Sequence, residues 1–192
     1  MKLLDVRECR GKRINLSSYT HILAYHACRS ESESNYRTYG LKPYTKDEAL
    51  SAAIQLLTSD RISAADVEAE LNNLWAINQS TNVYLMLETT EFLSTSTHYL
   101  IYGSEFMNAL AMHLGCRDAL TKIGRPMFVV CAVPIAEISP GWLNGLTDAI
   151  KRKDTAYWSI AVESVAANNI IGFLYPTGCV RDPYTNALRK LG

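Results

Sequence analysis

Short apolar runs alternate with amphipathic stretches along this chain, and the first confident run predicts a buried strand. Residues 22–27 are apolar or aromatic except for His26, so their backbone is expected to pair within a sheet while His26 and Arg29 emerge near the carboxyl end of the strand. A polar segment follows, and then a short predicted helix that ends at Gly40, ahead of Pro43. Binding and catalytic groups are often placed at strand ends of this kind.

Two amphipathic helices are predicted within residues 45–77, as an insertion between sheet strands. Thr45 and Glu48 have the spacing of a capping box at the start of the first helix. Ser63, followed by acidic Asp66 in the first turn, is the predicted cap of the second. Each helix has a stripe of Leu, Ile or Val at helical spacing, which predicts packing of one face.

The second half of the chain predicts the rest of a sheet. The remaining predicted strands are residues 82–87, 127–133, 157–162 and 169–174, and helices are predicted over 117–123 and 142–150. Because residues 127–133 are continuously apolar, we expect that strand to be central and covered on both faces. Residues 98–102 are either a strand that leads into a helix capped by Ser104 or the first part of one longer helix.

Composition bounds the domain and its partners. A chain of 192 residues with 48% hydrophobic content predicts a single α+β domain over residues 1–192, with a basic N-terminal segment (1–18) and a loosely held polar tail (179–192). Lys plus Arg and Asp plus Glu are both 19, so there is no formal net charge. This balance argues against broad, non-specific attraction to nucleic acid or to an anionic membrane.

The cysteines and the hydropathy pattern predict a cytoplasmic protein. The five cysteines include no Cys-x-x-Cys pair and no metal-finger spacing, which favours free thiols in a reducing compartment and no metal site. No apolar run approaches the roughly 20 residues that span a bilayer, and the residues after Met1 lack a signal-peptide core. No membrane partner is expected.

The order of strand, His26, Arg29, short helix and Gly40-Leu41 resembles the start of the ADP-ribosyltransferase fold. This is the NAD-binding fold of poly-ADP-ribose polymerases, diphtheria-like toxins, DNA-modifying toxins and RNA 2'-phosphotransferases, in which a strand ending in His-Gly-Thr or similar precedes a short helix and a Gly-Leu or Gly-Ile turn. Here Ala27-Cys28 replaces Gly-Thr. Residues 124–126, Gly-Arg-Pro before the core strand, also resemble the 2'-phosphotransferase and DNA-modifying branches. The resemblance implies an ADP-ribosyltransferase-like split, twisted β-sheet flanked by helices, with a helical insertion.

The resemblance also implies how NAD would bind. His26 would hold the nicotinamide ribose or amide, Arg29 would face the pyrophosphate, Tyr84 would lie in the NAD cleft, and Tyr102 would stack on nicotinamide. The implied cofactor-binding residues are therefore His26, Ala27, Arg29, Tyr84, Tyr102 and Ser104. Breaking the bond between nicotinamide and ribose creates an oxocarbenium-like centre, so the enzyme must orient the dinucleotide and stabilise positive charge.

A carboxylate is needed to stabilise this cation or to deprotonate the acceptor. Many family members have a Glu at the start of a late strand, where this chain has only Asp154, with Glu163 beyond the strand. Glu105 at the turn into the predicted helix is ranked first, so the implied catalytic set is Glu105, His26 and Tyr102. Cys28 next to His26 also leaves a Cys-His hydrolase open, although a buried inert thiol is the default state of such a cysteine.

The function implied by the resemblance is NAD-dependent transfer of ADP-ribose to a macromolecule. Nucleic acid is favoured over protein as the acceptor because basic residues gather within 1–13 and 151–153. By analogy with the family, the protein would be a toxin or phage-defence effector, with a cognate antitoxin or regulator as a partner. Two alternatives stay open: an enzyme resembling RNA 2'-phosphotransferases, and a non-catalytic binding module on the same fold.

Overall fold

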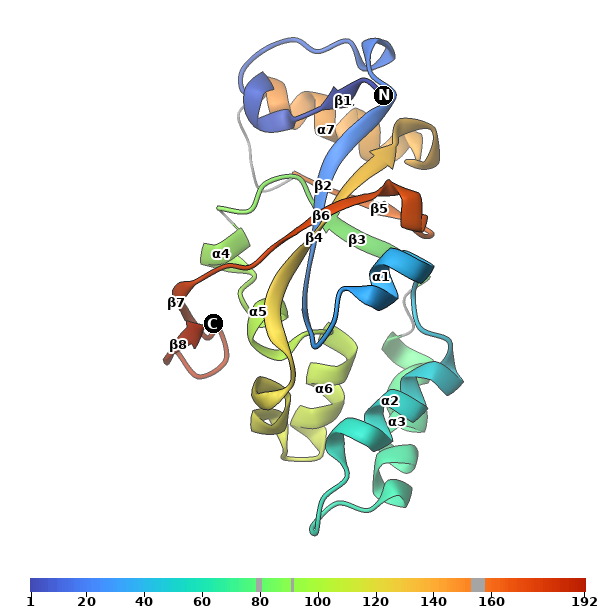
Figure 1. Cartoon of the computed structure of the whole chain (residues 1–192), viewed down its shortest axis with the longest axis vertical. Coiled ribbons are helices and arrows are strands. Elements are labelled where there is room, and N and C mark those ends of the chain that lie inside the picture. The colour runs from blue at the N-terminus through green and yellow to red at the C-terminus, as the bar shows by residue number, and fades with distance from the viewer. Residues whose placement is uncertain (79–80, 91, 153–157) are drawn as a thin grey trace.

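A twisted sheet with helices on both of its faces forms the centre of the computed structural model, which describes residues 1–78, 81–90, 92–152 and 158–192 (Figure 1). The strands of this sheet are β1 (Leu3–Leu4), β2 (His21–Ser30), β3 (Val83–Met86), β4 (Arg125–Pro134), β5 (Ser159–Val162) and β6 (Ile170–Leu174). Strands β7 (Gly178–Arg181) and β8 (Leu188–Leu191) form a separate hairpin.

The helices are distributed along the whole chain. The α-helices are α1 (Ser34–Tyr39), α2 (Lys46–Leu57), α3 (Ala64–Asn78), α4 (Phe92–Thr95), α5 (His98–Tyr102), α6 (Glu105–His113) and α7 (Pro140–Arg152). Short 3-10 helices are η1 (Val6–Cys9), η2 (Leu16–Ser18), η3 (Arg117–Lys122), η4 (Ile135–Glu137) and η6 (Ala167–Asn169). None of the helices in the described ranges is long and apolar enough to cross a membrane.

The strand order is β5-β3-β2-β4-β6, with β1 parallel to β2 and every other described pair antiparallel. Strands β2 and β4 pair along their full length, and β4 also pairs with β6, which confirms that the most apolar run is a central strand. By contrast, β2 and β3 share one register pair, Tyr25 with Met86. The sheet is therefore almost divided between β2 and β3.

Each face of the sheet has its own hydrophobic cluster, because side chains alternate between faces along a strand. One cluster includes Ile22, Ala24 and Cys28 of β2 and packs against α7. The other includes Tyr25 and Ala27 and packs against α2, α3, α5 and α6. The mixed α+β class expected from the sequence is thus confirmed.

The helix caps follow the sequence signals. Thr45 and Glu48 form the predicted capping box of α2, and Ser63 and Asp66 exchange hydrogen bonds before α3. Helix α1 ends at Gly40, whose φ is +76° and whose position has no room for a side chain, because a Cβ there would lie 2.1 Å from the carbonyl oxygen of Val165. Leu41 and Val165 then pair through two backbone hydrogen bonds of 2.8 Å.

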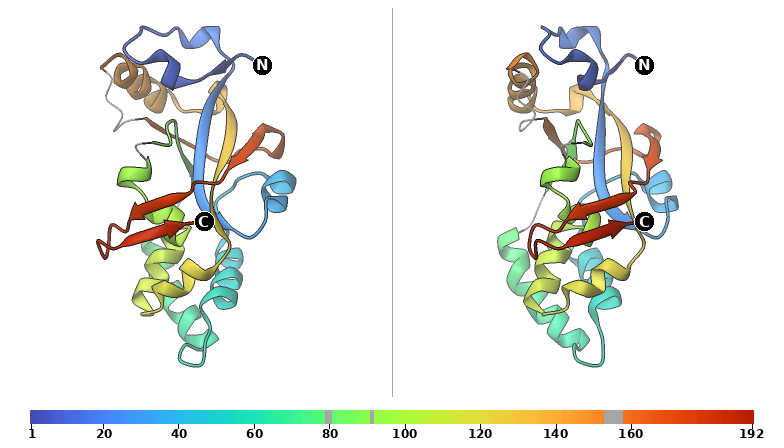
Figure 2. Two further views of the ribbon diagram at one scale, coloured as in Figure 1. Left: turned by 60° about the vertical axis from the view of Figure 1, so that its left-hand side comes forward. Right: turned by 90° about the vertical axis from the view of Figure 1, so that its left-hand side faces the viewer.

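Two expectations are corrected by the structure. Residues 98–102 are neither a strand nor part of one longer helix, because α5 ends at Gly103, whose φ is +83°, and Ser104 is the extended N-cap before α6. Residues 179–192 are not a loose tail but mainly the β7–β8 hairpin, which lies against α4 and α5 (Figure 2). The hairpin stays docked because Val180 and Leu191 are buried and Asp182 is fully buried.

Candidate functional site

His26 lies on β2, where the sheet is almost divided between β2 and β3, and its side chain bonds to β3. Its Nδ1 is 3.1 Å from the carbonyl oxygen of Tyr84 in β3. Since a carbonyl oxygen only accepts, Nδ1 carries the proton. Burial lowers the pKa of His26, so the neutral ring with a bare Nε2 is favoured at neutral pH. Among the described residues no group bonds to Nε2, and the side chain is only partly buried, which leaves an acceptor for an incoming hydroxyl group.

The predicted cofactor-binding residues do not gather on one face of the sheet. Alternation along β2 places His26 on the face with Cys28, whereas Ala27 and Arg29 belong to the opposite face. Tyr84 is 56% exposed and belongs, by its position between buried Val83 and Leu85, to the face opposite those two residues. Apart from the bond of its Nδ1 to the backbone carbonyl oxygen of Tyr84, no described hydrogen bond, ion pair or ring contact joins the His26 side chain to the residues on that other face.

Arg29 binds backbone carbonyl groups. Its Nε, Nη1 and Nη2 donate to the carbonyl oxygens of Ile123, Leu100, Thr121 and Gly124 at 2.9 to 3.1 Å. Partial burial lowers the pKa of Arg29, and in the described ranges no carboxylate pairs with it. Four of its five N–H groups are therefore used to hold the end of α5 and the η3–β4 turn together, which leaves little of its bidentate surface for a pyrophosphate.

Tyr102 is a core residue at the end of α5. It is 2% exposed, and its hydroxyl group donates to Oδ2 of Asp182 at 2.5 Å. The guanidinium carbon of Arg117 lies 5.5 Å from its ring centroid, and the ring of Tyr184 lies at 6.1 Å. The residue expected to stack on nicotinamide is thus already in contact with an arginine and a tyrosine.

Glu105 and Ser104 lie at the exposed start of α6. Ser104 caps the helix, and Glu105 accepts a hydrogen bond of 2.7 Å from the hydroxyl group of Tyr99. Burial, this bond and the neighbouring charges raise the pKa of Tyr99, and Tyr84 is close enough to contribute. The structure therefore pairs Glu105 with Tyr99, on the face opposite His26.

The two other candidate carboxylates are placed differently. Glu163 directly follows β5 and is exposed, while Asp154 lies outside the described residues. Sequence reasoning missed Glu88, which is 5% exposed just beyond β3 and accepts hydrogen bonds from Nη2 of Arg10 at 2.5 Å and from the amide of Thr90 at 2.9 Å. A carboxylate directly after a predicted strand was the available signal.

Cys28 is an unreactive thiol in this structure. Burial raises its pKa to about 11, and its Sγ accepts a hydrogen bond from the hydroxyl group of Tyr36 at 3.4 Å. At neutral pH the thiolate is therefore scarce, and no described contact links Cys28 to His26. This geometry removes the support for a Cys-His hydrolase. In the described parts of the chain, no three His, Cys, Asp or Glu side chains are grouped as metal ligands.

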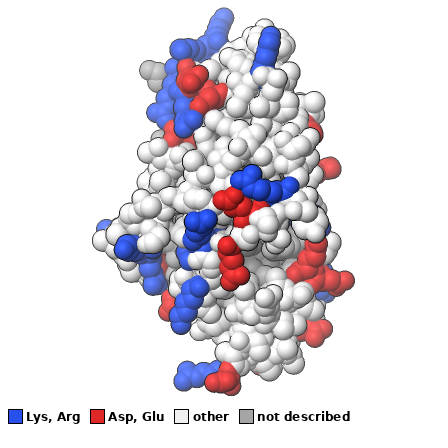
Figure 3. Space-filling view, in the orientation of Figure 1, with Lys and Arg blue, Asp and Glu red and all other residues white. Residues whose placement is uncertain are grey.

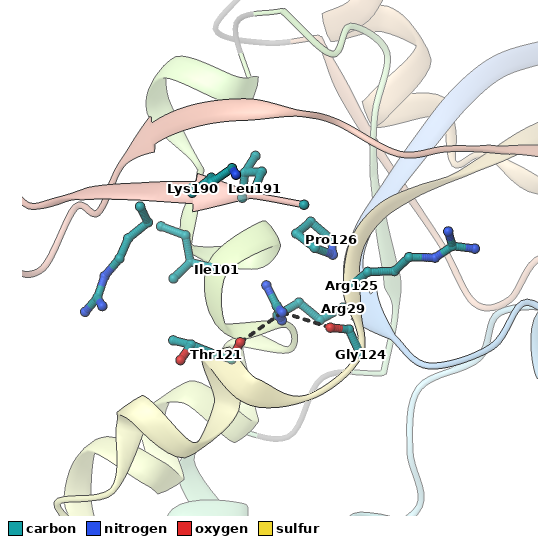
Figure 4. Close-up of a pocket in the computed structure, with 10 residues that line it drawn as sticks. Arg29, Ile101, Thr121, Gly124, Arg125, Pro126, Lys190 and Leu191 are labelled. Atoms are coloured by element: carbon teal, nitrogen blue, oxygen red, sulfur yellow. Dashed lines mark hydrogen bonds between the residues drawn. The ribbon is translucent and has the colours of Figure 1, made fainter.

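Two cavities lie on the side of the molecule that contains Arg29 and Tyr102. The first has a volume of about 400 Å³ and lies between Arg29 and β8 (Figure 4). It is lined by Arg29, Ile101, Thr121, Gly124, Arg125, Pro126, Arg189, Lys190, Leu191 and Gly192. The second, of about 430 Å³, lies beside η3, where Tyr102, Arg117 and Lys122 contribute to its wall.

No model of a protein family, no curated protein sequence and no solved structure matches this chain.

Proposed function

We propose that this chain is an NAD-dependent ADP-ribosyltransferase with an ADP-ribosyltransferase-like fold, in which His26 binds the ribose next to nicotinamide. The observation that carries the proposal is the bond from Nδ1 of His26 to the carbonyl oxygen of Tyr84. It fixes the tautomer in which Nε2 accepts, and a ribose hydroxyl group is a donor of the required kind.

The surroundings of His26 support the same assignment. The strand that contains it is followed by the short helix α1, the left-handed Gly40 and Leu41, in the order that the resemblance requires. Leu41 is tied to Val165, which comes just after β5, so the Gly-Leu turn is fixed against the sheet. Leu41 belongs to the hydrophobic cluster on the face of the sheet that contains His26, and a fixed turn on that face would orient the dinucleotide without a large ordering cost.

The carboxylate that completes the proposed site can be identified by substituting each of the three candidates. Glu105 was ranked first from the sequence, but it bonds to Tyr99 on the opposite face from His26. Glu163 follows β5, which pairs with β3, and Asp154 precedes that strand in sequence. Separate Glu105→Gln, Glu163→Gln and Asp154→Asn variants would identify the group whose loss abolishes transfer while NAD binding is retained.

The test uses purified protein, labelled NAD and separate pools of protein, DNA and RNA. His26→Ala is compared with His21→Ala, a matched control because His21 lies on the same strand and bonds only to its neighbour Thr20 among the described side chains. The wild type and the His21→Ala control should transfer label to one pool, which we expect to be nucleic acid. The His26→Ala variant should transfer none. No labelled acceptor together with no calorimetric binding of NAD would refute the proposal.

A non-catalytic binding module on the same fold is the second candidate, and one specific observation favours it. Arg29 is committed to four carbonyl groups, and the described carboxylates have no contact with His26. NAD binding that His26→Ala removes, with no transfer to any pool, would support this module. The phosphotransferase-like alternative is less well supported, because it needs several Arg and His side chains around one phosphate and Arg29 faces away from His26. The role as a toxin or phage-defence effector, with an antitoxin or regulator, rests on the resemblance alone.

A further inference from the structure

The two cavities are unusually basic for a chain without net charge. The basic residues in their walls are Arg29, Arg125, Arg189 and Lys190 in the first and Arg117 and Lys122 in the second. We call these six residues the basic track. Asp118 is the one acidic residue in either wall. In Figure 3, Lys and Arg side chains gather toward the left and lower left of this face, over the β7–β8 hairpin and the η3–β4 turn.

The two cavities are joined through Arg189. This residue lines the first cavity, and its Nη2 lies 3.3 Å from Oδ1 of Asp118, which lines the second. Its Nε lies 3.4 Å from Oδ2 of buried Asp182. The basic track therefore runs from β4 across β8 to η3. Its charged lining residues are all positive except for Asp118.

Most of the positive charge on the basic track has no carboxylate partner. In the described ranges, Arg189 is the one member with an ion pair. Nε of Arg117 is buried without a hydrogen-bond partner among the described residues, whereas Arg29 already donates four of its five N–H groups to carbonyl oxygens. A desolvated cation without a counter-ion favours a bound anion, since Coulomb attraction is stronger where water is excluded.

Aromatic rings accompany the basic track at both ends. The guanidinium carbon of Arg117 lies 4.3 Å from the ring centroid of Tyr184, which is 48% exposed. At the other end, the side chain of Arg125 extends away from the first cavity (Figure 4), and its guanidinium carbon lies 3.6 Å from the ring centroid of Tyr175. Cations that follow a phosphate backbone and rings that stack on bases are the two components of single-strand binding sites.

We propose that the basic track binds single-stranded nucleic acid, with phosphates in the two cavities and a base stacked on Tyr184. Cavities of this size admit the phosphate and sugar of a nucleotide. A flexible single strand can place successive phosphates in both cavities, whereas the phosphates of a duplex are held on two rigid strands. The inference rests on the proposed function in one respect: the bound strand would be the acceptor of ADP-ribose. Binding itself requires neither NAD nor His26, so the two proposals can fail separately.

The experiment measures the anisotropy of labelled single-stranded DNA and RNA oligonucleotides of about 12 residues, without NAD. Lys122→Glu/Lys190→Glu removes two exposed members of the basic track that have no described partner. Lys46→Glu/Arg61→Glu is the control, because it makes the same change of charge at two exposed basic residues, on α2 and in the turn that follows it, outside both cavities and outside the basic segments 1–13 and 151–153. The first double variant should bind at least about tenfold more weakly, with a smaller salt dependence, and the control should bind within about twofold of the wild type.

Tyr184→Ala tests the stacking component and should weaken binding about tenfold with an unchanged salt dependence. Equal weakening in the two double variants would overturn the proposal, because it would show only a response to total charge. Absence of oligonucleotide binding by the wild type at low salt would overturn it as well. If His26→Ala binds oligonucleotides like the wild type while no NAD is bound or transferred by either, the proposed function fails and the basic track stands.

Discussion

The hydroxyl group of Tyr102 donates a hydrogen bond to Oδ2 of Asp182 at 2.5 Å, and neither side chain is more than 2% exposed. Asp182 also accepts from the hydroxyl group of Thr185 and from the amide of Tyr184. A buried carboxylate is tolerated when donors surround it in this way. The pair therefore fastens the β7–β8 hairpin to α5.

Tyr102→Phe should lower the free energy of unfolding by about 1–3 kcal/mol, because it removes a donor from a buried carboxylate and leaves the rest of the packing in place. Urea unfolding followed by circular dichroism measures the change. Tyr39→Phe is the control, since Tyr39 is 72% exposed, and it should change stability by less than about 0.5 kcal/mol. Equal effects of the two substitutions would contradict the structural role of this bond.

Low pH should weaken the attachment of the β7–β8 hairpin to α5. Burial of Asp182 opposes its ionisation, but the hydrogen bonds from Tyr102, Thr185 and the backbone outweigh burial and lower its pKa below the ordinary 3.8. A lowered pKa means that the unfolded state binds more protons, so this contribution is present above the ordinary value and is lost as the pH falls through the folded value. Asp182→Asn should remove that part of the pH dependence in unfolding curves measured below about pH 4.

Gly40→Ala should cost about 2–3 kcal/mol, because the new Cβ would meet the carbonyl oxygen of Val165 at 2.1 Å in a left-handed conformation. Gly141→Ala is the matched control. No atom lies within 4 Å of a Cβ there, and the position is in the first turn of α7, so we expect no loss or a gain of about 0.5–1 kcal/mol. Thermal unfolding distinguishes the two, and a neutral Gly40→Ala would show that the turn has more freedom than the structure indicates.

Alkylation should be faster at the exposed cysteine than at the buried ones. Cys179 is exposed, whereas burial raises the pKa of Cys28 to about 11 and that of Cys131 to about 12. With iodoacetamide near pH 8, peptide mass spectrometry should find Cys179 modified long before Cys28. Selective modification of Cys28 would restore the Cys-His hydrolase as a candidate.

His26 should titrate below the ordinary histidine value of 6.5, because burial disfavours its cation. The folded state then binds fewer protons than the unfolded state, so stability is lost as the pH falls below 6.5, and NAD binding through a bare Nε2 should weaken over the same interval. NMR titration of the imidazole between about pH 5 and pH 8 measures the midpoint. A midpoint above 6.5 would contradict the neutral ring with an accepting Nε2 on which the proposed NAD contact depends.

Local signals in the sequence were sufficient where a few neighbouring residues determine the structure. The Thr45 and Glu48 capping box, the end of α1 at Gly40 and the central position of β4 were all predicted and are confirmed. Each depends on hydrogen bonds or apolar character within one segment, which the sequence shows directly.

The candidate site was less predictable, because it depends on contacts between distant segments. His26 and Arg29 are three positions apart on a strand, so their division between two faces follows from the period of two and was readable in the sequence. The burial of Asp182 was not readable, since a polar turn with Asp, Pro and Thr resembles a surface loop until Tyr102 is placed beside it. The four carbonyl partners of Arg29 also come from segments about 70 to 95 residues away.

The docking of the β7–β8 hairpin has a consequence for the order of events during synthesis. Tyr102 of α5 and Thr97 directly before it donate hydrogen bonds to the carboxylate of Asp182 and to the carbonyl oxygen of Arg181, about 80 residues later in the chain. Until the ribosome has released that hairpin, the surface of α5 stays hydrated and its hydroxyl groups bond to water. Protection of the α5 amides from hydrogen exchange should therefore develop late, after β2 and β4 have already paired.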